Sequence, residues 1–391
     1  MGVDATFFRM VENNELIPLW HTIGDAEVVT GDTLSARELF DEIIQSAWKT
    51  GDPGFIFLDR INDGRSNPVP SFGPITTTNP CGEQPLYSWD SCNLGSLNLS
   101  NFILPNTNFD YDRLKEVIPT AVRFLDNVIE TNFYVLPQIE KMNKDIRRIG
   151  LGVMGWADLL YKMEIRYDSD EAVALGEKIS LFIQQQADQA SSDLGRERGN
   201  FLKFTESIYN GTSWVHMRNS TRTTIAPTGT ISIIAGVSSG IEPVFALEFD
   251  RQHGENIGKM KEFNPVYREW LVANQNSTRP EYFVTTHEIA AEWHIKHQAA
   301  WQKGVDNAVS KTINLPNTAT TKDIRAAYLN AWNSGCLGIT IYRDGSRTGQ
   351  VLSTVIAPED SAWKEDAKGL TQTHEIDRSA RKHLPTDRPR L

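Results

Sequence analysis

The sequence predicts an α/β fold built on parallel strands. Residues 308–315 and 338–343 are short apolar segments typical of strands, and residues 321–335 between them have the apolar spacing of a helix. A strand, a helix and a second strand in this order are typical of a parallel α/β unit. The composition agrees, because 40% hydrophobic and 23% charged residues are ordinary for a soluble globular protein. The length of 391 residues allows one large domain or two average ones.

The other elements are predicted from apolar periodicity and from residues that start or stop helices. Residues 34–49 repeat apolar side chains at helical spacing behind a candidate N-cap, Thr33, and the GDPG sequence at 51–54 ends that helix. A short strand or extended segment begins at Phe55, and residues 62–78 form a loop rich in Gly, Pro, Ser and Asn. Further helices are predicted for residues 112–134, 138–163 (one helix or two), 170–197 and 287–304.

Composition also excludes several classes of function. A formal net charge of −11 argues against general nucleic-acid binding, for which clustered positive charge is expected. The chain has no run of about 18 apolar residues that could span a membrane. Residues 1–14 lack the basic and apolar regions of a signal peptide. Three cysteines favour a reducing compartment over an oxidised secreted scaffold. We therefore expect a cytoplasmic protein that binds neither nucleic acid nor membranes.

Residues 79–99, NPCGEQPLYSWDSCNLGSLNL, are the most informative segment. They carry an amide, a thiol and a carboxylate at alternate positions, Asn79, Cys81 and Glu83, and a second thiol, Cys92, eleven residues after the first. Alternate residues of an extended segment point the same way, so the three side chains are expected to converge. An amide, a hydrogen donor and a base in one small volume predict a catalytic tip. On spacing alone, a packed thiol, an incidental disulfide and half of a zinc site stay open as alternatives.

A second candidate site is the sequence PTGTIS. Hydroxyl groups and free N–H groups at a turn that opens a helix can bind an anion, although most such strings are simply capped turns. The apolar run at 230–237 is compatible with either a strand or a helix. The candidate phosphate-binding residues are Pro227, Thr228, Gly229, Thr230, Ile231 and Ser232.

Other polar and aromatic residues favour structural roles. His287, His294 and His297 lie on one predicted helix, where polar helix surface and packing are favoured over a metal site. Cys336 is expected to be a structural thiol. No metal site is predicted. Three tryptophans are expected in the core rather than as a base-stacking platform: Trp293, Trp301 and Trp332.

Five segments, in order along the chain, resemble the large catalytic chain of ribonucleotide reductases. The N-x-C-x-E segment is similar to the family's finger loop, and the Gly-Gln-Pro version with Cys92 close behind is most similar to the adenosylcobalamin-dependent class. The other four segments are residues 147–160, 221–247, 306–320 and 331–347. The resemblance implies a ten-stranded α/β barrel with the finger loop at its centre. Residues 1–348 would form the C-terminal part of this barrel, and residues 349–391 a polar, mobile tail.

The resemblance also implies a reaction, the reduction of ribonucleotides to 2′-deoxyribonucleotides for DNA synthesis by a thiyl radical. Cys81 would carry the radical, Glu83 would accept the 3′-hydroxyl proton, and Asn79 would orient the ribose hydroxyls. Cys92 would be one of two thiols that supply electrons and become a disulfide. In this context residues 227–232 would bind the substrate phosphate, and Glu242 and Pro243, in a similar block, receive no role. The sequence does not distinguish diphosphate from triphosphate substrates.

Adenosylcobalamin is the cofactor that the resemblance implies. Relatives that import their radical from a diiron subunit carry two adjacent tyrosines near the last barrel strand, whereas Tyr342 stands alone here and is followed by Arg343. A ribonucleotide substrate and a thiol reductant such as thioredoxin are further implied partners, and a homodimer is usual in the family.

Parts of the family pattern have no counterpart in this sequence. These are the first barrel strands, the redox partner of Cys92, the effector loops and the C-terminal thiol pair. We therefore expect the C-terminal half of a catalytic core, which needs a complementary N-terminal half. Two alternatives stay open: part of a diiron-dependent reductase, and a non-catalytic remnant or assembly partner that retains the fold. A thiol–disulfide oxidoreductase is disfavoured, because the sequence has no C-x-x-C pair.

Overall fold

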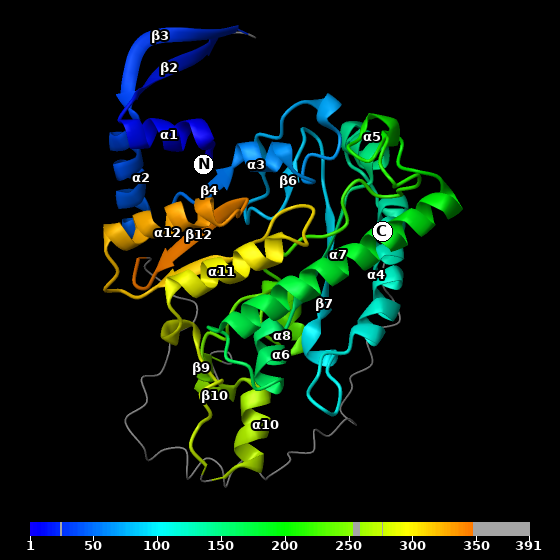
Figure 1. Cartoon of the computed structure of the whole chain (residues 1–391), viewed down its shortest axis with the longest axis vertical. Coiled ribbons are helices and arrows are strands. Elements are labelled where there is room, and N and C mark those ends of the chain that lie inside the picture. Colours follow the sequence, from blue (N-terminus) through cyan, green and yellow to red (C-terminus); the bar gives the residue numbers. More distant parts are fainter. Residues whose placement is uncertain (24–25, 253–258, 276, 347–391) are drawn as a thin grey trace, which may run out of the picture.

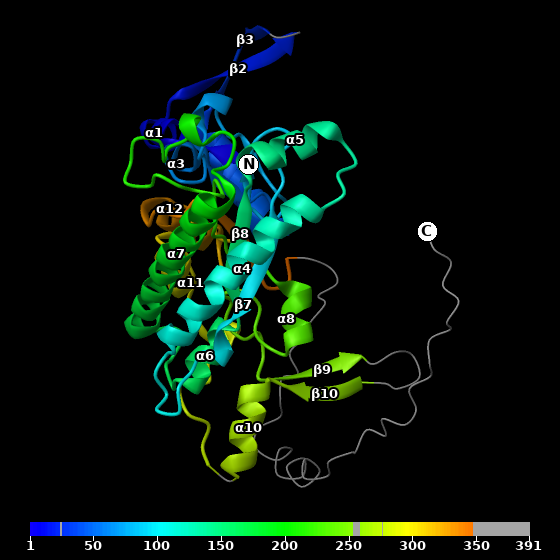
Figure 2. The ribbon, with the colours of Figure 1, turned by 90° about the vertical axis from the view of Figure 1, so that its right-hand side faces the viewer.

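The computed structural model describes residues 1–23, 26–252, 259–275 and 277–346. Helices and strands alternate in a mixed α/β body, from which the β2–β3 hairpin stands off beside α1 and α2 (Figure 1). A second hairpin, β9–β10, projects from the body in the perpendicular view (Figure 2). The predicted tail at 349–391 lies outside the described residues.

The helices are α1 (Ala5–Asn13), α2 (Ala36–Thr50), α3 (Leu58–Asp63), α4 (Tyr111–Thr131), α5 (Pro137–Ile146), α6 (Trp156–Lys162), α7 (Asp170–Arg198), α8 (Gly229–Ala235), α10 (Pro265–Ala273), α11 (Ala291–Gln302) and α12 (Thr321–Asn333). The strands are β1 (Gly2–Val3), β2 (Leu16–Ile23), β3 (Ala26–Ser35), β4 (Phe55–Phe57), β5 (Thr77–Thr78), β6 (Pro85–Leu86), β7 (Asn93–Asn98), β8 (Ile149–Met154), β9 (Glu248–Gln252), β10 (Lys259–Phe263), β11 (Thr312–Leu315) and β12 (Gly338–Arg343).

Most predicted helices are confirmed, and their ends follow from capping. Helix α2 begins after Ser35, whose side chain accepts a hydrogen bond from the backbone N–H of Glu38, so the expected N-cap at Thr33 is wrong by two residues. Gly51 ends the helix with a positive φ of 79°, as the GDPG sequence predicts. Helices α4, α7 and α12 match their predicted segments closely, and the ambiguous run at 230–237 is helical as α8.

The predicted helical segment 138–163 is wrong at its centre. It contains α5 and α6, but the strand β8 lies between them. Every residue of β8 is buried, and a short run that is buried on both faces has no period of its own to distinguish strand from helix. Two other predicted elements are shorter in the structure. The predicted helix 287–304 begins as α11 at Ala291, and the predicted strand 308–315 begins as β11 at Thr312.

Parallel strands form the frame that positions the loop at residues 79–84. β7 pairs with β8 in parallel, from Asn93 opposite Ile149 to Asn98 opposite Met154. Isolated parallel bridges continue this array from Leu151 to Thr223 and from Ile225 to Val309, just before β11. β11 pairs in parallel with β12, β12 pairs antiparallel with β4, and β4 pairs in parallel with β1. The parallel α/β organisation is therefore confirmed, but the strands of the described part of the chain do not close into a barrel.

Two large apolar cores hold the layers together, and a third, small one lies around Ile61, Tyr87 and Phe201. In the larger one, the helices α4, α6, α7 and α11 pack with β8, and Trp156 meets Trp301 edge to face at 5.3 Å. The smaller core joins α1, α2 and α12 to β4 and β12. Cys336 is buried there, which agrees with its predicted structural role. Trp301 is fully buried, while Trp293 and Trp332 are partly buried against the two cores, which agrees with the predicted core role of all three.

Gly152 in β8 is required by the close approach of the neighbouring strand segment. A Cβ at this position would lie 2.2 Å from the backbone oxygen of Thr224, and two strands that share hydrogen bonds cannot move apart cheaply. We expect Gly152→Ala to lower the free energy of unfolding by about 1–3 kcal/mol. Urea denaturation followed by circular dichroism measures this. Gly229→Ala is the control, since a Cβ there meets open space; equal midpoints for the two variants would contradict the prediction.

Candidate active site

Residues 79–84 form a closed loop at the end of the β5–β6 hairpin. The side-chain oxygen of Asn79 accepts a hydrogen bond from the backbone N–H of Gln84 at 3.0 Å. The backbone N–H of Asn79 donates to the Gln84 carbonyl at 3.1 Å. The Asn79 carbonyl accepts from the N–H of Gly82, whose φ of +83° favours glycine. The expected extended conformation is therefore wrong, because Asn79 folds the loop back on itself.

The loop separates the two chemically active side chains that follow Asn79. Cys81 is exposed at the tip, whereas Glu83 is 2% exposed and faces the interior. The side chains at alternate positions thus differ in burial. Cys81 and Glu83 still interact: partial burial and then the Glu83 carboxylate raise the pKa of the Cys81 thiol. The thiol therefore keeps its S–H hydrogen at neutral pH, the form from which a hydrogen atom can be removed.

Glu83 anchors the loop to the parallel strands through its backbone. Its carbonyl accepts hydrogen bonds from the N–H of Ala308 at 2.9 Å and from the Thr224 hydroxyl at 3.0 Å. Its carboxylate oxygen Oε2 is buried and has no hydrogen-bond partner among the described residues, and the same holds for both polar side-chain atoms of Gln84. Buried polar atoms without partners are costly, so these groups are available to a bound ligand.

Cys92 immediately precedes β7 and is partly buried, with its sulfur 3.5 Å from the Asn93 carbonyl oxygen. Burial raises the pKa of this thiol, Arg148 opposes the rise, and the carboxylates of Asp90 and Glu83 add to it. Glu83 therefore acts electrostatically on both Cys81 and Cys92. The structure brings the two predicted thiols into the field of one carboxylate, and all three cysteines of the chain are free.

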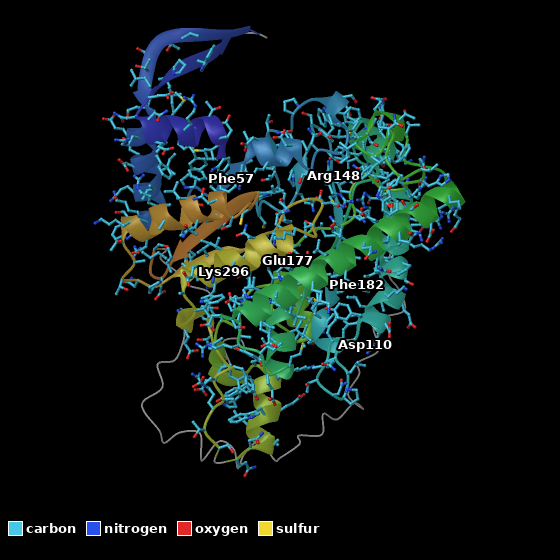
Figure 3. The ribbon with its side chains drawn as sticks, viewed as in Figure 1. Phe57, Asp110, Arg148, Glu177, Phe182 and Lys296 are labelled. Atoms are coloured by element: carbon cyan, nitrogen blue, oxygen red, sulfur yellow. The ribbon has the colours of Figure 1, made fainter. Side chains whose placement is uncertain are left out.

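Sequence reasoning missed a buried ion pair beside Cys92. Arg148, labelled in Figure 3, is fully buried, and its Nε lies 2.7 Å from Oδ2 of Asp90. Its Nη1 donates to Asn307 at 2.8 Å, and its guanidinium carbon lies 5.5 Å from the centre of the Tyr87 ring. The available signal was a pair of arginines, 147 and 148, directly before a buried strand, where a charged side chain needs a partner.

The candidate phosphate segment begins two residues after Ile225. Thr228 has a left-handed backbone, φ +57°, and caps α8, while its hydroxyl accepts from the N–H of Gly240 at 2.8 Å. The hydroxyl of Ser232 lies 2.8 Å from that of Ser239, so both of these hydroxyls serve the local fold. Gly229, Thr230 and Ile231 are exposed. The N–H groups of the first helical turn have no acceptor within the helix, so they face outward as possible anion donors.

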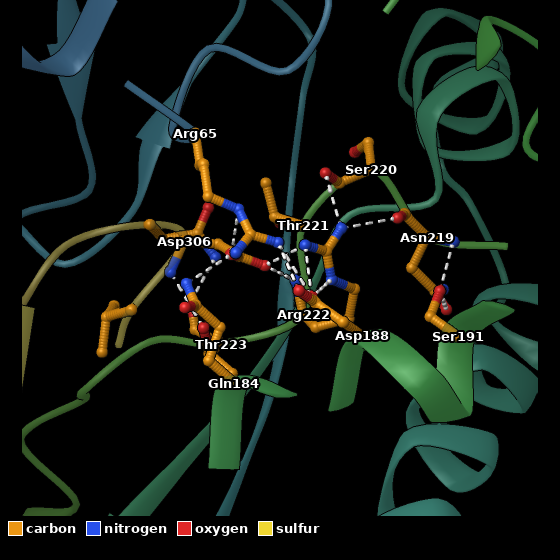
Figure 4. Close-up of polar contacts among 12 residues, drawn as sticks. Arg65, Gln184, Asp188, Ser191, Asn219, Ser220, Thr221, Arg222, Thr223 and Asp306 are labelled. Carbon is orange, nitrogen blue, oxygen red and sulfur yellow. Dashed lines mark hydrogen bonds and ion pairs between the residues drawn. The ribbon is translucent and has the colours of Figure 1, made fainter. Parts of the chain in front are cut away.

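A buried charge cluster holds the strand segment on which Glu83 rests. Figure 4 shows the guanidinium groups of Arg65 and Arg222 turned toward Asp188 and Asp306. Arg222 lies 2.7 Å from Asp188 and 2.9 Å from Asp306, and Arg65 lies 2.8 and 2.9 Å from the same carboxylates. Asp306 also accepts from the backbone N–H of Arg222 at 2.7 Å. These bonds fix residues 222–224 against α7.

The three histidines have structural surroundings. His294 and His297 are fully buried, and Nε2 of His297 lies 2.8 Å from the Tyr167 carbonyl oxygen. His287 packs edge to face against Phe245. The three histidines therefore pack against neighbouring side chains and backbone. Within the described ranges, no group of three or more His, Cys, Asp or Glu side chains could hold a metal ion. Glu242, which the sequence left without a role, pairs with the buried Lys311 and accepts from the N–H of Thr312.

No helix in the described part of the chain is long and apolar enough to cross a membrane.

Comparison with known proteins defines the class. Residues 7–342 match the family model described as ribonucleotide reductase, barrel domain. The chain belongs to the ribonucleotide reductase family, as its sequence motifs predict.

Among its relatives is the vitamin B12-dependent ribonucleoside-diphosphate reductase of Thermoplasma acidophilum, 46% identical over 378 residues, which cover 90% of this chain and 48% of the relative. The protein of the same name from Mycobacterium tuberculosis (strain CDC 1551 / Oshkosh) is 46% identical over 391 residues, covering 94% of this chain and 55% of the relative. A ribonucleoside-diphosphate reductase subunit alpha of Chlamydia pneumoniae is 32% identical over 363 residues, which cover 77% of this chain and 34% of the relative. The chain spans about half the length of these two vitamin B12-dependent relatives.

Proposed function

We propose that this chain carries the thiyl-radical half of a vitamin B12-dependent ribonucleoside-diphosphate reductase. The observation that carries the proposal is the loop at 79–84, which presents an exposed Cys81 thiol beside the buried Glu83 carboxylate. The family match over residues 7–342 and the printed names of the relatives at 46% identity support the reaction, the cofactor and the diphosphate substrate. In this proposal residues 1–348 are the C-terminal part of the barrel, whose finger loop is residues 79–84.

The reaction assigns one step to each residue. The Cys81 thiyl radical takes the hydrogen atom from C3′ of the ribose, and the Glu83 carboxylate takes the 3′-hydroxyl proton as general base. The 2′-hydroxyl then leaves as water. Cys92 and a second thiol give up two electrons and two protons and join in a disulfide, and the C3′ hydrogen returns from Cys81. The side-chain oxygen of Asn79 is engaged with Gln84, so its NH2 group is the part that orients the ribose.

Residues 227–232 are the proposed contact for the substrate phosphates. Their support is position: Thr224 binds the Glu83 carbonyl, and the chain runs directly from there to Pro227 and the exposed start of α8. The N–H groups of Gly229, Thr230 and Ile231 are the donors we assign, because the hydroxyls of Thr228 and Ser232 are used within the loop.

The residues present fit an adenosylcobalamin cofactor. Cys81 is exposed at the loop tip and can be reached from outside the chain. Arg343, where a second relay tyrosine would stand, is 8% exposed and donates to the carbonyls of Trp48 and Asn317 at 2.9 and 3.1 Å, which is a structural role. Adenosylcobalamin, when bound, supplies the radical that removes the hydrogen atom from the Cys81 thiol. Cys81 is the residue of this chain that would meet it.

The proposal includes a complementary polypeptide. Because the chain spans about half of its relatives, we infer that it acts with a second half that contributes the redox partner of Cys92. A dithiol protein such as thioredoxin would then reduce the disulfide, in the cytoplasm, and two copies of the assembled protein would form a homodimer.

An omission assay tests the proposed function. The chain is mixed with the polypeptide encoded next to it, a ribonucleoside diphosphate and dithiothreitol, with and without adenosylcobalamin. We expect deoxyribonucleotide with all components and none when the cofactor or the second polypeptide is left out. Product that instead requires a diiron subunit would place the chain in the other reductase class. No product from folded, associated chains under either condition would support the non-catalytic alternative.

A further inference from the structure

Cys92 and Arg148 are opposite each other at the start of the β7–β8 ladder. The first pair in the parallel register is Asn93 with Ile149, so the residues one position earlier, Cys92 and Arg148, continue the same register. Opposite residues of a pleated parallel pair project to the same side. The strand register therefore places the two side chains on the same side of the ladder, and the charge of Arg148 acts on the Cys92 thiol, although the two residues are far apart in sequence.

The Arg148 side chain is held rigidly by three segments. Its Nε pairs with Asp90 at 2.7 Å, and its Nη1 donates to Oδ1 of Asn307 at 2.8 Å and to the carbonyl of Ser66 at 3.2 Å. Asp90 precedes Cys92 by two residues, so the anchor of the guanidinium belongs to the same short segment as the thiol. Arg148 cannot turn toward solvent, because its side chain is completely buried.

The Arg148–Asp90 ion pair leaves one donor and one acceptor without a hydrogen bond. Arg148 Nη2 is buried and makes no hydrogen bond within the described residues, and Oδ1 of Asp90 is in the same condition. A buried ion pair adds to stability only when its remaining donors and acceptors are also bonded. An ion pair that served the fold alone would gain from a third partner at Nη2. The unpaired N–H group is a buried donor that a further negative charge close to it would satisfy.

We propose that Arg148 is a positioning residue for the redox chemistry of Cys92, with its Nη2 donating to the sulfur whenever Cys92 is a thiolate. This rests on the proposed function for the identity of Cys92 as a redox thiol. In re-reduction, the thiolate of an external dithiol attacks the partner sulfur of the Cys92 disulfide, and the Cys92 sulfur leaves with the bonding electron pair as a thiolate. The second thiol of the reductant then closes its own disulfide, and each released thiolate takes up a proton from solvent.

Electrostatics at Cys92 agree with this role. The charged groups that act on the thiol are Arg148, directly before β8, Asp90 from the preceding turn and Glu83 from the hairpin loop. Burial and the two carboxylates raise the pKa of Cys92, and Arg148 is the group that lowers it. Removing the cation leaves burial and two negative charges unopposed, so the pKa rises further and less thiolate exists at any pH below it. A thiol with a higher pKa is also a slower leaving group when its disulfide is reduced.

Alkylation by iodoacetamide measures the effect on the 391-residue chain itself. The rate at each cysteine is followed by peptide mass spectrometry between about pH 7 and pH 11, in wild type, Arg148→Met and Arg148→Lys. We expect the Cys92 rate near pH 8 to fall about tenfold in Arg148→Met, corresponding to one pKa unit, and less in Arg148→Lys, which keeps the charge. Cys81 is the internal reference and should react equally in all three. Cys336 should stay protected, which reports an intact fold.

Two results would overturn the proposal. An unchanged Cys92 rate in folded Arg148→Met would show that the guanidinium does not act on the sulfur. A Cys92 rate that rises at every pH would show that Arg148 only holds the structure closed. If Arg148→Met does not fold, Arg148→Gln decides, since glutamine keeps amide donors for Asp90 without the charge: a slowed rate supports the proposal and a wild-type rate refutes it. None of these measurements depends on nucleotide reduction. A failure of this proposal is therefore distinguishable from a failure of the proposed function.

Discussion

Cys81→Ser is expected to reduce deoxyribonucleotide formation to the uncatalysed background. A serine O–H bond is much stronger than a cysteine S–H bond, so the hydroxyl cannot form the radical that removes hydrogen from C3′. The substitution changes one atom at an exposed loop tip and leaves the loop contacts of Asn79, Gly82 and Glu83 in place. Product is measured by chromatography in the assembled system, with circular dichroism to show that the variant is folded.

Cys92→Ser is the matched variant for this experiment, and its expected behaviour differs. Radical formation at Cys81 is expected to survive, because Cys92 belongs to a separate segment before β7. Sustained turnover with dithiothreitol is expected to stop, since the disulfide that supplies the electrons cannot form. Near-normal and equal rates in both variants would remove the basis for assigning either thiol.

The second large effect is expected at the buried charge cluster. Asp306→Asn removes a carboxylate that lies within 2.9 Å of both Arg222 and Arg65, and the amide cannot balance their charges. Breaking a buried ion pair by removing one partner costs about 3–5 kcal/mol, because a charge is left buried without compensation. Urea denaturation of the chain measures this loss. The control is Glu197→Gln in the exposed pair with Arg123, where we expect a change of at most about 1 kcal/mol.

The Asp306 carboxylate should also make the stability of the fold depend on pH. Burial alone would raise the pKa of Asp306, but Arg222 and Arg65 bring it below its ordinary value of 3.8. A carboxylate with a lowered pKa in the folded state stabilises the fold above its unfolded value, and this contribution is lost as the pH falls through the folded value. The difference in stability between wild type and Asp306→Asn should therefore be constant above about pH 5 and shrink below about pH 4. A difference that stays constant down to pH 3 would contradict this account.

The helices and the parallel organisation could be predicted from the sequence because they depend on local patterns. Helix α2 needs only an apolar stripe, a serine cap and a terminal glycine, and all three can be seen in residues 35–51. The strand β8 could not be recognised in the same way. Its residues are all buried, because β7 and the segment at 221–225 pair with its two edges and helices of the larger core pack against its side chains, and such burial is a property of the tertiary fold. The family motif at 147–160 located this segment without showing that it holds a strand.

The chemistry of the site was visible in the sequence, whereas its geometry was not. Asn79, Cys81 and Glu83 were singled out by residue type and by family resemblance, but alternation predicted one shared face. Three hydrogen bonds between Asn79 and its own loop close the segment instead of leaving it extended, and within this loop Cys81 is exposed and Glu83 is buried. Arg148 could not be recognised for a different reason, because its partners Asp90 and Asn307 are distant in sequence. The β7–β8 pairing brings Asp90 close, and hydrogen bonds from Asn307 to Thr223 and Ile149 bring Asn307 close.

A single-turnover experiment tests the central claim most directly. The wild-type chain, its complementary half, adenosylcobalamin and a ribonucleoside diphosphate are mixed with no external reductant, and product and Cys92 oxidation are quantified in the same quenched samples. We predict one deoxyribonucleotide for each Cys92 converted to a disulfide, with Cys81 still a thiol at the end and no product from Cys81→Ser. Product that accumulates while Cys92 remains reduced, or product from Cys81→Ser, would contradict the assignment of these two thiols.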